Sequence, residues 1–198
     1  VSASHNAGAY NGIKCYGPDG CQMTDEPAAI VYNKITEIPY FVPAEADFAS
    51  QLSAGAVEFI APEMWTAYYD RVMEERIALE PSSNLNVLYT PLCGTGNKPV
   101  REIFRRIGAN VDVVKVQEHP DGDFKTCEYP NPETDAALNE SYKVAQNVPC
   151  DLILGTDPDA DRVAIAVPNG NGFTKLSGNE LGCLLMDYIL KARTARGD

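Results

Sequence analysis

Three aspartates stand at alternate positions directly after an apolar run, at Asp157, Asp159 and Asp161, and Arg162 follows them. Carboxylates this close repel one another by roughly 4 kcal/mol per pair at ~4 Å and an effective dielectric constant of ~20. A bound cation or a raised carboxyl pKa is the simplest way to offset that repulsion. Oxygen ligands in small number suit Mg²⁺, which keeps its other positions for water and phosphate. The spacing therefore indicates a magnesium site.

Other interpretations of this acidic segment have to be weighed against a magnesium site. An EF-hand loop counted from Asp157 needs Gly at its sixth position and Glu at its twelfth, where this chain has Arg162 and Pro168, so that interpretation fails. A phosphatase of the haloacid dehalogenase type carries a DxDx[TV] motif; Asp157-Pro-Asp159-Ala160 supplies its first half and lacks the Thr or Val. That phosphatase, a solvated acidic turn and a cation-binding module without catalysis remain open.

A second set of candidate catalytic groups lies near the start of the chain. Ser4 offers a nucleophilic hydroxyl, and His5 and Lys14 are candidates for handling protons beside it. Taken alone, a Ser-His dipeptide is typical of surface loops. The segment indicates catalysis only in combination with the acidic one.

Two glycines, Gly94 and Gly96, follow another apolar run. They do not form a dinucleotide fingerprint, because its third glycine would fall on Pro99, and the chain has no P-loop motif. The glycines either let backbone amides approach a phosphate at the start of the next helix or form a plain tight turn.

The elements that must position these groups follow from the apolar periodicity. The alternation predicts an α/β fold in which a mixed, mostly parallel sheet is flanked by helices. Because ligands bind outside the carboxyl ends of the strands in such sheets, the segments 90–96 and 155–161 are expected at the site. Strands are expected at 12–16, 86–90, 111–116, 152–154, 163–167 (antiparallel) and 173–176, and helices at 27–36, 62–79, 98–107, 132–146 and 179–192.

Composition excludes several classes of partner. The formal net charge of −12 argues against nucleic acid, since binding phosphates requires basic surface. No apolar run is long enough to span a membrane. Six singly placed cysteines and two histidines make a poor zinc pattern and a poor disulfide framework, so reduced thiols in a cytoplasmic protein are expected. Because the sequence begins without Met, we expect a piece of something longer.

Together, the serine segment and the acidic segment resemble the α-D-phosphohexomutase family, phosphoglucomutase/phosphomannomutase. That family carries a T-A-S-H-N-P phosphoserine loop followed by N-G-x-K, and a D-x-D-x-D-R metal loop in its second domain. It also has a T-P-L-H-G-x-G loop at a strand end and a characteristic segment that opens its third domain. The corresponding stretches here are 2–7, 11–14, 157–162, 89–96 and 176–180.

The resemblance implies a division of the chain into parts of known domains. Residues 1–40 correspond to the C-terminal part of domain 1 with the phosphoserine loop, and 41–60 to a linker. Residues 61–176 correspond to domain 2 with the metal-binding loop, and 177–198 to the start of domain 3. Because the sugar-discriminating loop of the third domain and the phosphate-binding fourth domain are then absent, we expect this piece by itself to be inactive.

The resemblance also implies the metal centre. Ser4 corresponds to the phosphoserine, and its phosphate completes the coordination of one Mg²⁺ held by Asp157, Asp159 and Asp161. The cation offsets the repulsion between the carboxylates and polarises the phosphoryl oxygens.

The implied reaction interconverts hexose 1-phosphate and hexose 6-phosphate, of glucose or mannose, through a hexose 1,6-bisphosphate. By the resemblance, His5 and Lys14 assist proton transfer at the sugar hydroxyl, and Arg162 stabilises charge on the moving phosphoryl group. The implied partners are small-molecule hexose phosphates, with no nucleic acid and no membrane.

Three positions depart from the family pattern. Ser2 stands where Thr is usual and Ala7 where Pro is usual, so the serine loop is expected to be looser. Cys93 stands where His is common, which puts any contact from that side chain in doubt.

Overall fold

The structure, a computed structural model, describes residues 2–41, 47–77, 84–170 and 172–197. The chain forms two compact units, one made of residues 1–12 with 68–198 and the other of residues 13–67. The first unit therefore unites the serine segment at the start of the chain with the acidic segment near residue 160.

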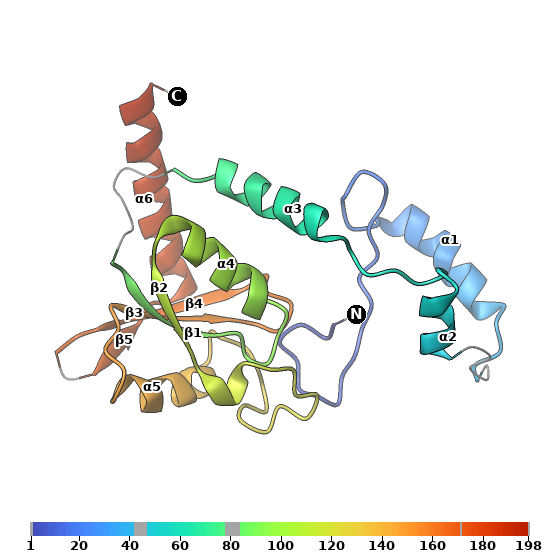
Figure 1. Ribbon diagram of the computed structural model, residues 1–198, viewed down its shortest axis with the longest axis horizontal. Coiled ribbons are helices and arrows are strands. Elements are labelled where there is room, and N and C mark those ends of the chain that lie inside the picture. Colours follow the sequence, from blue (N-terminus) through green and yellow to red (C-terminus); the bar gives the residue numbers. More distant parts are fainter. Residues whose placement is uncertain (1, 42–46, 78–83, 171, 198) are drawn as a thin grey trace. The chain divides into compact units, whose positions relative to one another are not determined.

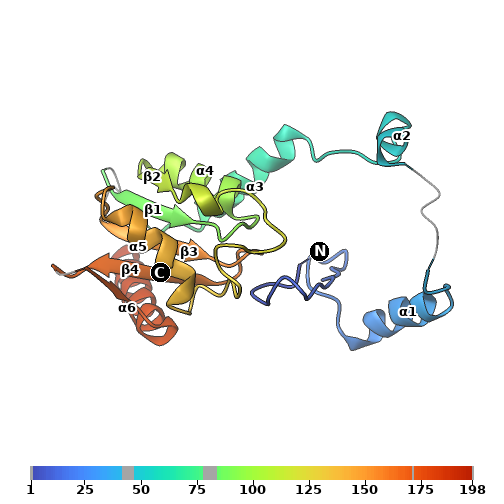
Figure 2. The same ribbon diagram turned by 90° about the horizontal axis from the view of Figure 1, so that it is seen from below.

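A five-stranded sheet in the order β2-β1-β3-β4-β5 forms the centre of the first unit (Figures 1 and 2). Strand β1 runs parallel to both β2 and β3, whereas β4 is antiparallel to β3 and β5 is antiparallel to β4. The predicted α/β fold with a mixed sheet is confirmed, including the antiparallel return after the acidic segment. The strands are β1 (Asn86–Thr90), β2 (Asn110–Val113), β3 (Leu152–Thr156), β4 (Val163–Pro168) and β5 (Phe173–Lys175).

Side chains alternate along the strands, so the sheet has two apolar faces. On one face, Leu88 of β1 and Ile153 of β3 are fully buried in a cluster that packs against α5. On the other face, Val87 and Tyr89 of β1 pack with Phe104 of α4. Figures 1 and 2 show the two helices on opposite sides of the sheet. The helices that cover the sheet are α4 (Asn97–Ile107) and α5 (Asn139–Ala145).

The helix predicted at 132–146 is wrong in its first half. The 3-10 helix η2 (Ala136–Leu138) precedes α5, and a turn precedes η2. The Asn131 side chain accepts a hydrogen bond from the Glu133 amide at 3.1 Å, and the Thr134 hydroxyl donates to the Asn131 carbonyl at 2.8 Å. Such local hydrogen bonds offer the backbone an alternative to the helix, so the α-helix begins later than the apolar pattern of residues 132–146 predicts.

Strand β2 is shorter than the 111–116 prediction, and the 3-10 helix η1 (Lys115–Gln117) follows it. The Val114 amide still donates to the Tyr89 carbonyl at 2.9 Å. The chain then turns, and the Gln117 carbonyl accepts a hydrogen bond from the Cys93 amide at 2.9 Å. The end of β2 is thereby tied to the loop that leaves β1.

The last helix of the first unit is α6 (Gly178–Arg196). A capping box starts it: the Ser177 hydroxyl accepts from the Glu180 amide at 3.2 Å, and the Glu180 carboxylate accepts from the Ser177 amide at 2.8 Å. The helix predicted at 179–192 is confirmed and extends slightly beyond both predicted ends. Within the described parts of the chain, no helix is long and apolar enough to cross a membrane.

The second unit is helical. The helix predicted at 27–36 is confirmed. The helix predicted at 62–79 begins at Pro62 as expected but ends at Glu74, so the prediction is too long by residues 75–77, and residues 78–79 lie outside the described residues. The strand predicted at 12–16 is wrong, because the chain folds back on itself and makes one isolated bridge, Tyr16 with Gln22. The expected connection contains a short helix, and its residues 42–46 are not described. These helices are α1 (Asp25–Thr36), α2 (Phe48–Ser53) and α3 (Pro62–Glu74), whose C-terminal half belongs to the first unit.

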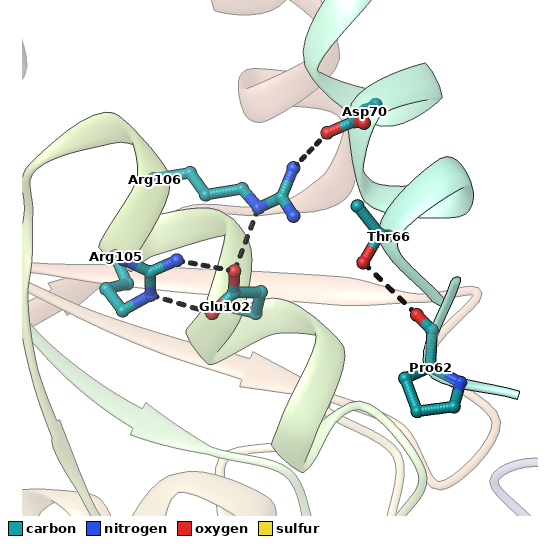
Figure 3. Close-up of polar contacts among 6 residues, drawn as sticks. All are labelled: Pro62, Thr66, Asp70, Glu102, Arg105 and Arg106. Atoms are coloured by element: carbon teal, nitrogen blue, oxygen red, sulfur yellow. Dashed lines mark hydrogen bonds and ion pairs between the residues drawn. The ribbon is translucent and has the colours of Figure 1, made fainter. Parts of the chain in front are cut away.

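A charged cluster joins α4 to the C-terminal half of α3 (Figure 3). Glu102 accepts hydrogen bonds from Arg105 at 2.7 and 2.8 Å and from Arg106 at 2.8 Å. Arg106 also donates to Asp70 of α3 at 2.5 Å and lies 5.1 Å from the centre of the Tyr69 ring. Hydrogen bonds from Arg105 and Arg106 lower the pKa of Glu102 to about 2.

The low pKa of Glu102 predicts an acid-dependent contribution to stability. A carboxyl whose folded pKa is depressed stabilises the fold above its ordinary value of 4.5, and this contribution is lost as the pH falls toward 2. The variant Glu102→Gln is therefore expected to melt at a lower temperature than the wild type at pH 7, with a difference that shrinks below pH 4.5. Melting curves of both proteins from pH 7 to pH 2.5 test this; a difference that stays constant with pH contradicts it.

Candidate active site

The two loops predicted to form the site leave neighbouring parallel strands at the same edge of the sheet. Thr90 at the end of β1 pairs with Gly155 of β3. Beside this pair, the Tyr89 hydroxyl and the Thr156 hydroxyl share a buried hydrogen bond of 2.8 Å. The loops 91–96 and 157–162 therefore start from a fixed common base.

The acidic loop is organised around Asp157, which is fully buried. Its Oδ1 accepts hydrogen bonds from the backbone amides of Asp161 at 3.1 Å and Arg162 at 2.9 Å. Its carbonyl accepts from the amide of Ala160 at 2.9 Å, and Ala160 has a φ of 61°, in the left-handed region. This turn wraps the chain around the Asp157 carboxylate.

The turn brings three carboxylates to one point. One oxygen each from Asp157, Asp159 and Asp161 can be chosen so that all lie within 4.8 Å of one another. Burial raises the pKa of Asp157, and the Asp159 carboxyl raises it further, while hydrogen bonds from the Arg162 amide and Ser4 oppose the rise. Asp157 is therefore harder to ionise than an exposed aspartate, and a nearby cation would offset this cost. Three clustered carboxylates, one of them buried, fit a hard divalent cation such as Mg²⁺.

The serine segment meets the acidic loop at Asp157. The Ser4 hydroxyl donates a hydrogen bond to Asp157 Oδ2 at 2.9 Å and lies 3.0 Å from His5 Nδ1. Ser4 has a φ of 56°, and its amide donates to the Ser2 hydroxyl at 2.8 Å. If the Ser4 hydroxyl gives its one hydrogen to Asp157, a hydrogen bond with His5 requires the tautomer that carries a proton on Nδ1. The structure thus joins two segments separated by 153 residues.

Arg162 and Lys14 are the two remaining predicted residues. Arg162 fixes Asp157 through its backbone, and its guanidinium lies 3.8 Å from the Glu133 carboxylate. Lys14 belongs to the second unit, where it is half-buried. The roles predicted for both side chains stay predictions.

A pocket of about 370 Å³ opens beside the serine segment, within the first unit. Ser4, Cys93 and Phe124 are among the residues that line it. Cys93 is buried, and burial raises the pKa of its thiol. A neutral thiol at this position cannot take over the proton transfer or the positive charge that a histidine offers.

Both glycines of the first loop stand where a side chain would collide with neighbouring residues. A Cβ on Gly96 would lie 2.5 Å from the Tyr89 hydroxyl and 2.9 Å from the Thr156 hydroxyl. A Cβ on Gly94 would lie 2.4 Å from the Cα of Pro158. Gly94 allows the two loops to approach each other, and Gly96 leaves room for the hydrogen-bonded hydroxyls of β1 and β3. Sequence reasoning missed both contacts; the paired glycines were the available signal.

The buried Tyr89 hydroxyl predicts a pH-dependent loss of stability. Burial raises its pKa to about 12 from 10.0, so the folded state resists ionisation. Below pH 10 the hydroxyl is neutral in both the folded and the unfolded state. Between pH 10 and pH 12 it ionises in the unfolded state alone, which lowers the free energy of unfolding by about 1.4 kcal/mol per pH unit, roughly 2.7 kcal/mol in all. We expect Tyr89→Phe to be less stable by about 1–3 kcal/mol at pH 7, since Thr156 loses its partner.

Urea unfolding of wild type and Tyr89→Phe between pH 7 and pH 11.5 measures this difference. The advantage of the wild type is expected to shrink above pH 10. An advantage that is constant up to pH 11.5 contradicts the burial of this hydroxyl as the cause.

Comparison with known protein families matches two segments of the chain to the same family. Residues 66–170 match the family described as phosphoglucomutase/phosphomannomutase, alpha/beta/alpha domain II, and residues 1–40 match alpha/beta/alpha domain I of the same description. The phosphoglucomutase of Staphylococcus aureus (strain USA300) is 33% identical over 193 residues, which is 96% of this chain and 35% of that protein. The chain thus spans about a third of the length of the curated relatives it matches.

Solved structures support the fold. A phosphoglucomutase/phosphomannomutase family protein from Burkholderia thailandensis superposes with a TM-score of 0.58 at 16% identity, over 84% of this chain and 32% of that chain. A protein described as a phosphomannomutase from Thermus thermophilus gives a TM-score of 0.59 at 24% identity, over 87% of this chain and 36% of that chain. With family matches over both the serine segment and the acidic loop, the chain belongs to the phosphoglucomutase/phosphomannomutase family.

Proposed function

We propose that this chain is part of a phosphohexomutase that interconverts hexose 1-phosphate and hexose 6-phosphate, of glucose, mannose or both, through a phosphoserine at Ser4. The observation that carries the proposal is the hydrogen bond of 2.9 Å between the Ser4 hydroxyl and Asp157. It supports the proposal because the hydroxyl predicted to be the nucleophile contacts one of the three clustered carboxylates.

Asp157, Asp159 and Asp161 are the residues that would hold Mg²⁺, together with a phosphate on Ser4. When bound, the cation neutralises charge on the phosphoryl oxygens and the carboxylates. The chemistry of the donor set supports this assignment, because all three ligands are hard oxygen donors and the pKa of the buried one is raised by burial and further by its acidic neighbour.

In the proposed transfer, the chain's own groups have the following roles. The phosphoryl group passes from Ser4 to the free hydroxyl of a hexose monophosphate; the bond between serine oxygen and phosphorus breaks, and one to the sugar oxygen forms. The proton of the sugar hydroxyl leaves through His5 or Lys14, and the departing serine oxygen takes up one proton to become the Ser4 hydroxyl. Arg162 stabilises charge on the moving group. The resulting hexose 1,6-bisphosphate reorients, and its other phosphoryl group returns to Ser4, which restores the phosphoserine.

The pocket beside Ser4 supports a small-molecule substrate. Its volume of about 370 Å³ is at the lower end of the range of small-molecule pockets, ~300–1,000 Å³. Residues beyond this chain would complete the enclosure, in keeping with a chain that spans 35% of its curated relatives. The predicted domain boundaries and the inactivity of these 198 residues on their own stay predictions.

The rival enzyme, an aspartyl-phosphate phosphatase, needs Asp157 as a free nucleophile. Both carboxylate oxygens of Asp157 accept hydrogen bonds here, Oδ1 from two backbone amides and Oδ2 from Ser4. An oxygen held in this way anchors the loop and is poorly placed to attack phosphorus. The geometry therefore favours Ser4 as the group that carries phosphate.

An assay of the natural full-length protein with Mg²⁺ and a trace of hexose 1,6-bisphosphate tests the proposal. We expect glucose 1-phosphate, mannose 1-phosphate or both to be converted into the 6-phosphates without release of inorganic phosphate. Release of inorganic phosphate as the main product would favour the phosphatase. No reaction of either sugar phosphate would favour a non-catalytic cation-binding module.

A further inference from the structure

The carbonyl of Pro158 receives two hydrogen bonds from one residue of the neighbouring loop. The Thr95 amide donates to it at 2.8 Å and the Thr95 hydroxyl at 3.1 Å. Pro158 stands between Asp157 and Asp159, so this carbonyl belongs to the peptide group that leads into Asp159. Two donors on one oxygen fix the orientation of that peptide plane.

The contact is built by an unusual course of the backbone. Leu92 and Cys93 have φ values of 47° and 59°, which turn the loop toward the acidic segment. Gly94 allows the approach, since a Cβ there would meet Pro158 at 2.4–2.5 Å, on its Cα and its carbonyl oxygen. Backbone in the left-handed region is costly for residues other than glycine, roughly 1–3 kcal/mol each, and persists where the surroundings demand it. The loop is shaped to bring Thr95 to Pro158.

Proline contributes from the other side of the contact. Its ring fixes φ near −65°, so Pro158 keeps few alternative conformations once its carbonyl is held. Asp157 is fixed by the backbone amides of Asp161 and Arg162. Asp159 lies on the other side of the proline, and the bonds from Thr95 fix the peptide group that joins it to Pro158.

From this geometry, and resting on the proposed function, we propose that Thr95 is a positioning residue for the cation site, acting through the Pro158 carbonyl on the direction of Asp159. Both hydrogen bonds described for Thr95 go to the Pro158 carbonyl. Its side chain is exposed, so its hydroxyl is not needed to satisfy a buried group, and its removal is expected to change cation affinity rather than folding.

The test is a titration of the protein with Mn²⁺, followed by electron paramagnetic resonance of the free ion, for wild type, Thr95→Val and Thr95→Ser. Valine keeps the shape and the backbone donor but removes the hydroxyl, and serine keeps the hydroxyl. We expect the dissociation constant of Thr95→Val to rise about 10-fold, the lower end of the 10–100-fold cost of losing an outer partner of a metal site. Thr95→Ser is expected within about 2-fold of the wild type, because it restores the bond.

Melting without metal is the second readout. We expect the melting temperature of Thr95→Val to stay within about 2 °C of the wild type. If that variant does not fold, Thr95→Ala takes its place with the same expected loss of affinity. Equal Mn²⁺ affinity of wild type and Thr95→Val, or equal weakening by valine and serine, overturns the positioning role and leaves the proposed function standing. A wild type that binds no Mn²⁺ overturns both.

Discussion

The variant Ser4→Ala is expected to take up no phosphate from hexose 1,6-bisphosphate and to lose mutase activity by a factor on the order of 10⁴ or more, as for removal of a covalent nucleophile. The reason is chemical rather than structural. Ser4 is half-buried, and its hydroxyl bonds to Asp157 at 2.9 Å, so it is the group aimed at the carboxylate cluster. Radioactive phosphate transfer and a coupled mutase assay on the natural full-length protein measure the two effects.

Ser53→Ala is the matched control. Ser53 lies on α2, and its hydroxyl donates to the Ala49 carbonyl at 2.9 Å, far from the proposed chemistry in sequence and exposed to solvent. The Ser53→Ala variant also loses a serine hydroxyl, but it should take up radioactive phosphate and convert hexose phosphates as the wild type does. Labelling of Ser4→Ala at the wild-type level would place the phosphate on another residue and end the phosphoserine proposal.

Asp159→Asn is expected to have opposite effects on stability and on cation binding. Without metal, the change removes negative charge beside the buried Asp157 and should stabilise the fold by roughly 1–3 kcal/mol, from the repulsion between carboxylates within a few ångströms. With metal, it removes a charged ligand, and Mg²⁺ affinity should fall by at least about 100-fold, since even outer partners cost about 10–100-fold. Urea unfolding without metal and calorimetric titration with Mg²⁺ measure the two quantities.

Asp187→Asn controls for the loss of one charge from an acidic protein. Asp187 is an exposed residue of α6 that pairs with Lys191 at 2.7 Å, so its neutralisation should change neither quantity by much. An Asp159→Asn protein with unchanged stability and unchanged Mg²⁺ binding would mean that the acidic loop is a solvated turn. A loss of stability without metal would contradict the charge-repulsion argument.

The sequence predicted the elements whose signals are local and strong. The apolar run before Asp157 and the run at 86–90 became the neighbouring strands β3 and β1, and the helix from residue 98 was found to within a residue. The edge of the sheet that carries both loops followed from the general rule for parallel strands. These predictions succeeded because burial of alternating or periodic side chains dictates the element directly.

The wrongly predicted elements are those whose conformation depends on local side-chain hydrogen bonds or on a neighbouring strand. Side-chain bonds around Asn131 replace the first turns of a predicted helix. The apolar stretch at 12–16 has strand composition, but a strand needs a partner, and the described chain gives it one bridge at Tyr16. Apolar periodicity reveals neither the side-chain hydrogen bonds nor the lack of a partner strand.

The sequence supplied candidate site residues but not the contacts that hold them in place. The acidic triplet could be read from its spacing, whereas the meeting of Ser4 with Asp157 was implied by the family resemblance and could not be derived from the chain alone. The contact between Thr95 and Pro158 depends on a hydrogen bond of 2.8 Å from the Thr95 amide to the Pro158 carbonyl, and on the positive φ of two non-glycine residues. Such features follow from packing between loops, for which one sequence carries no direct signal.

The most direct test of the central claim is the location of phosphate by peptide mass analysis of the natural full-length protein. Samples are taken as purified, after hexose 1,6-bisphosphate with Mg²⁺, and after a further excess of hexose monophosphate. The account predicts phosphate on Ser4 in the loaded protein and its loss when hexose monophosphate is added. A Ser4 free of phosphate in every sample would contradict it and would mean that the three aspartates bind a cation for another purpose.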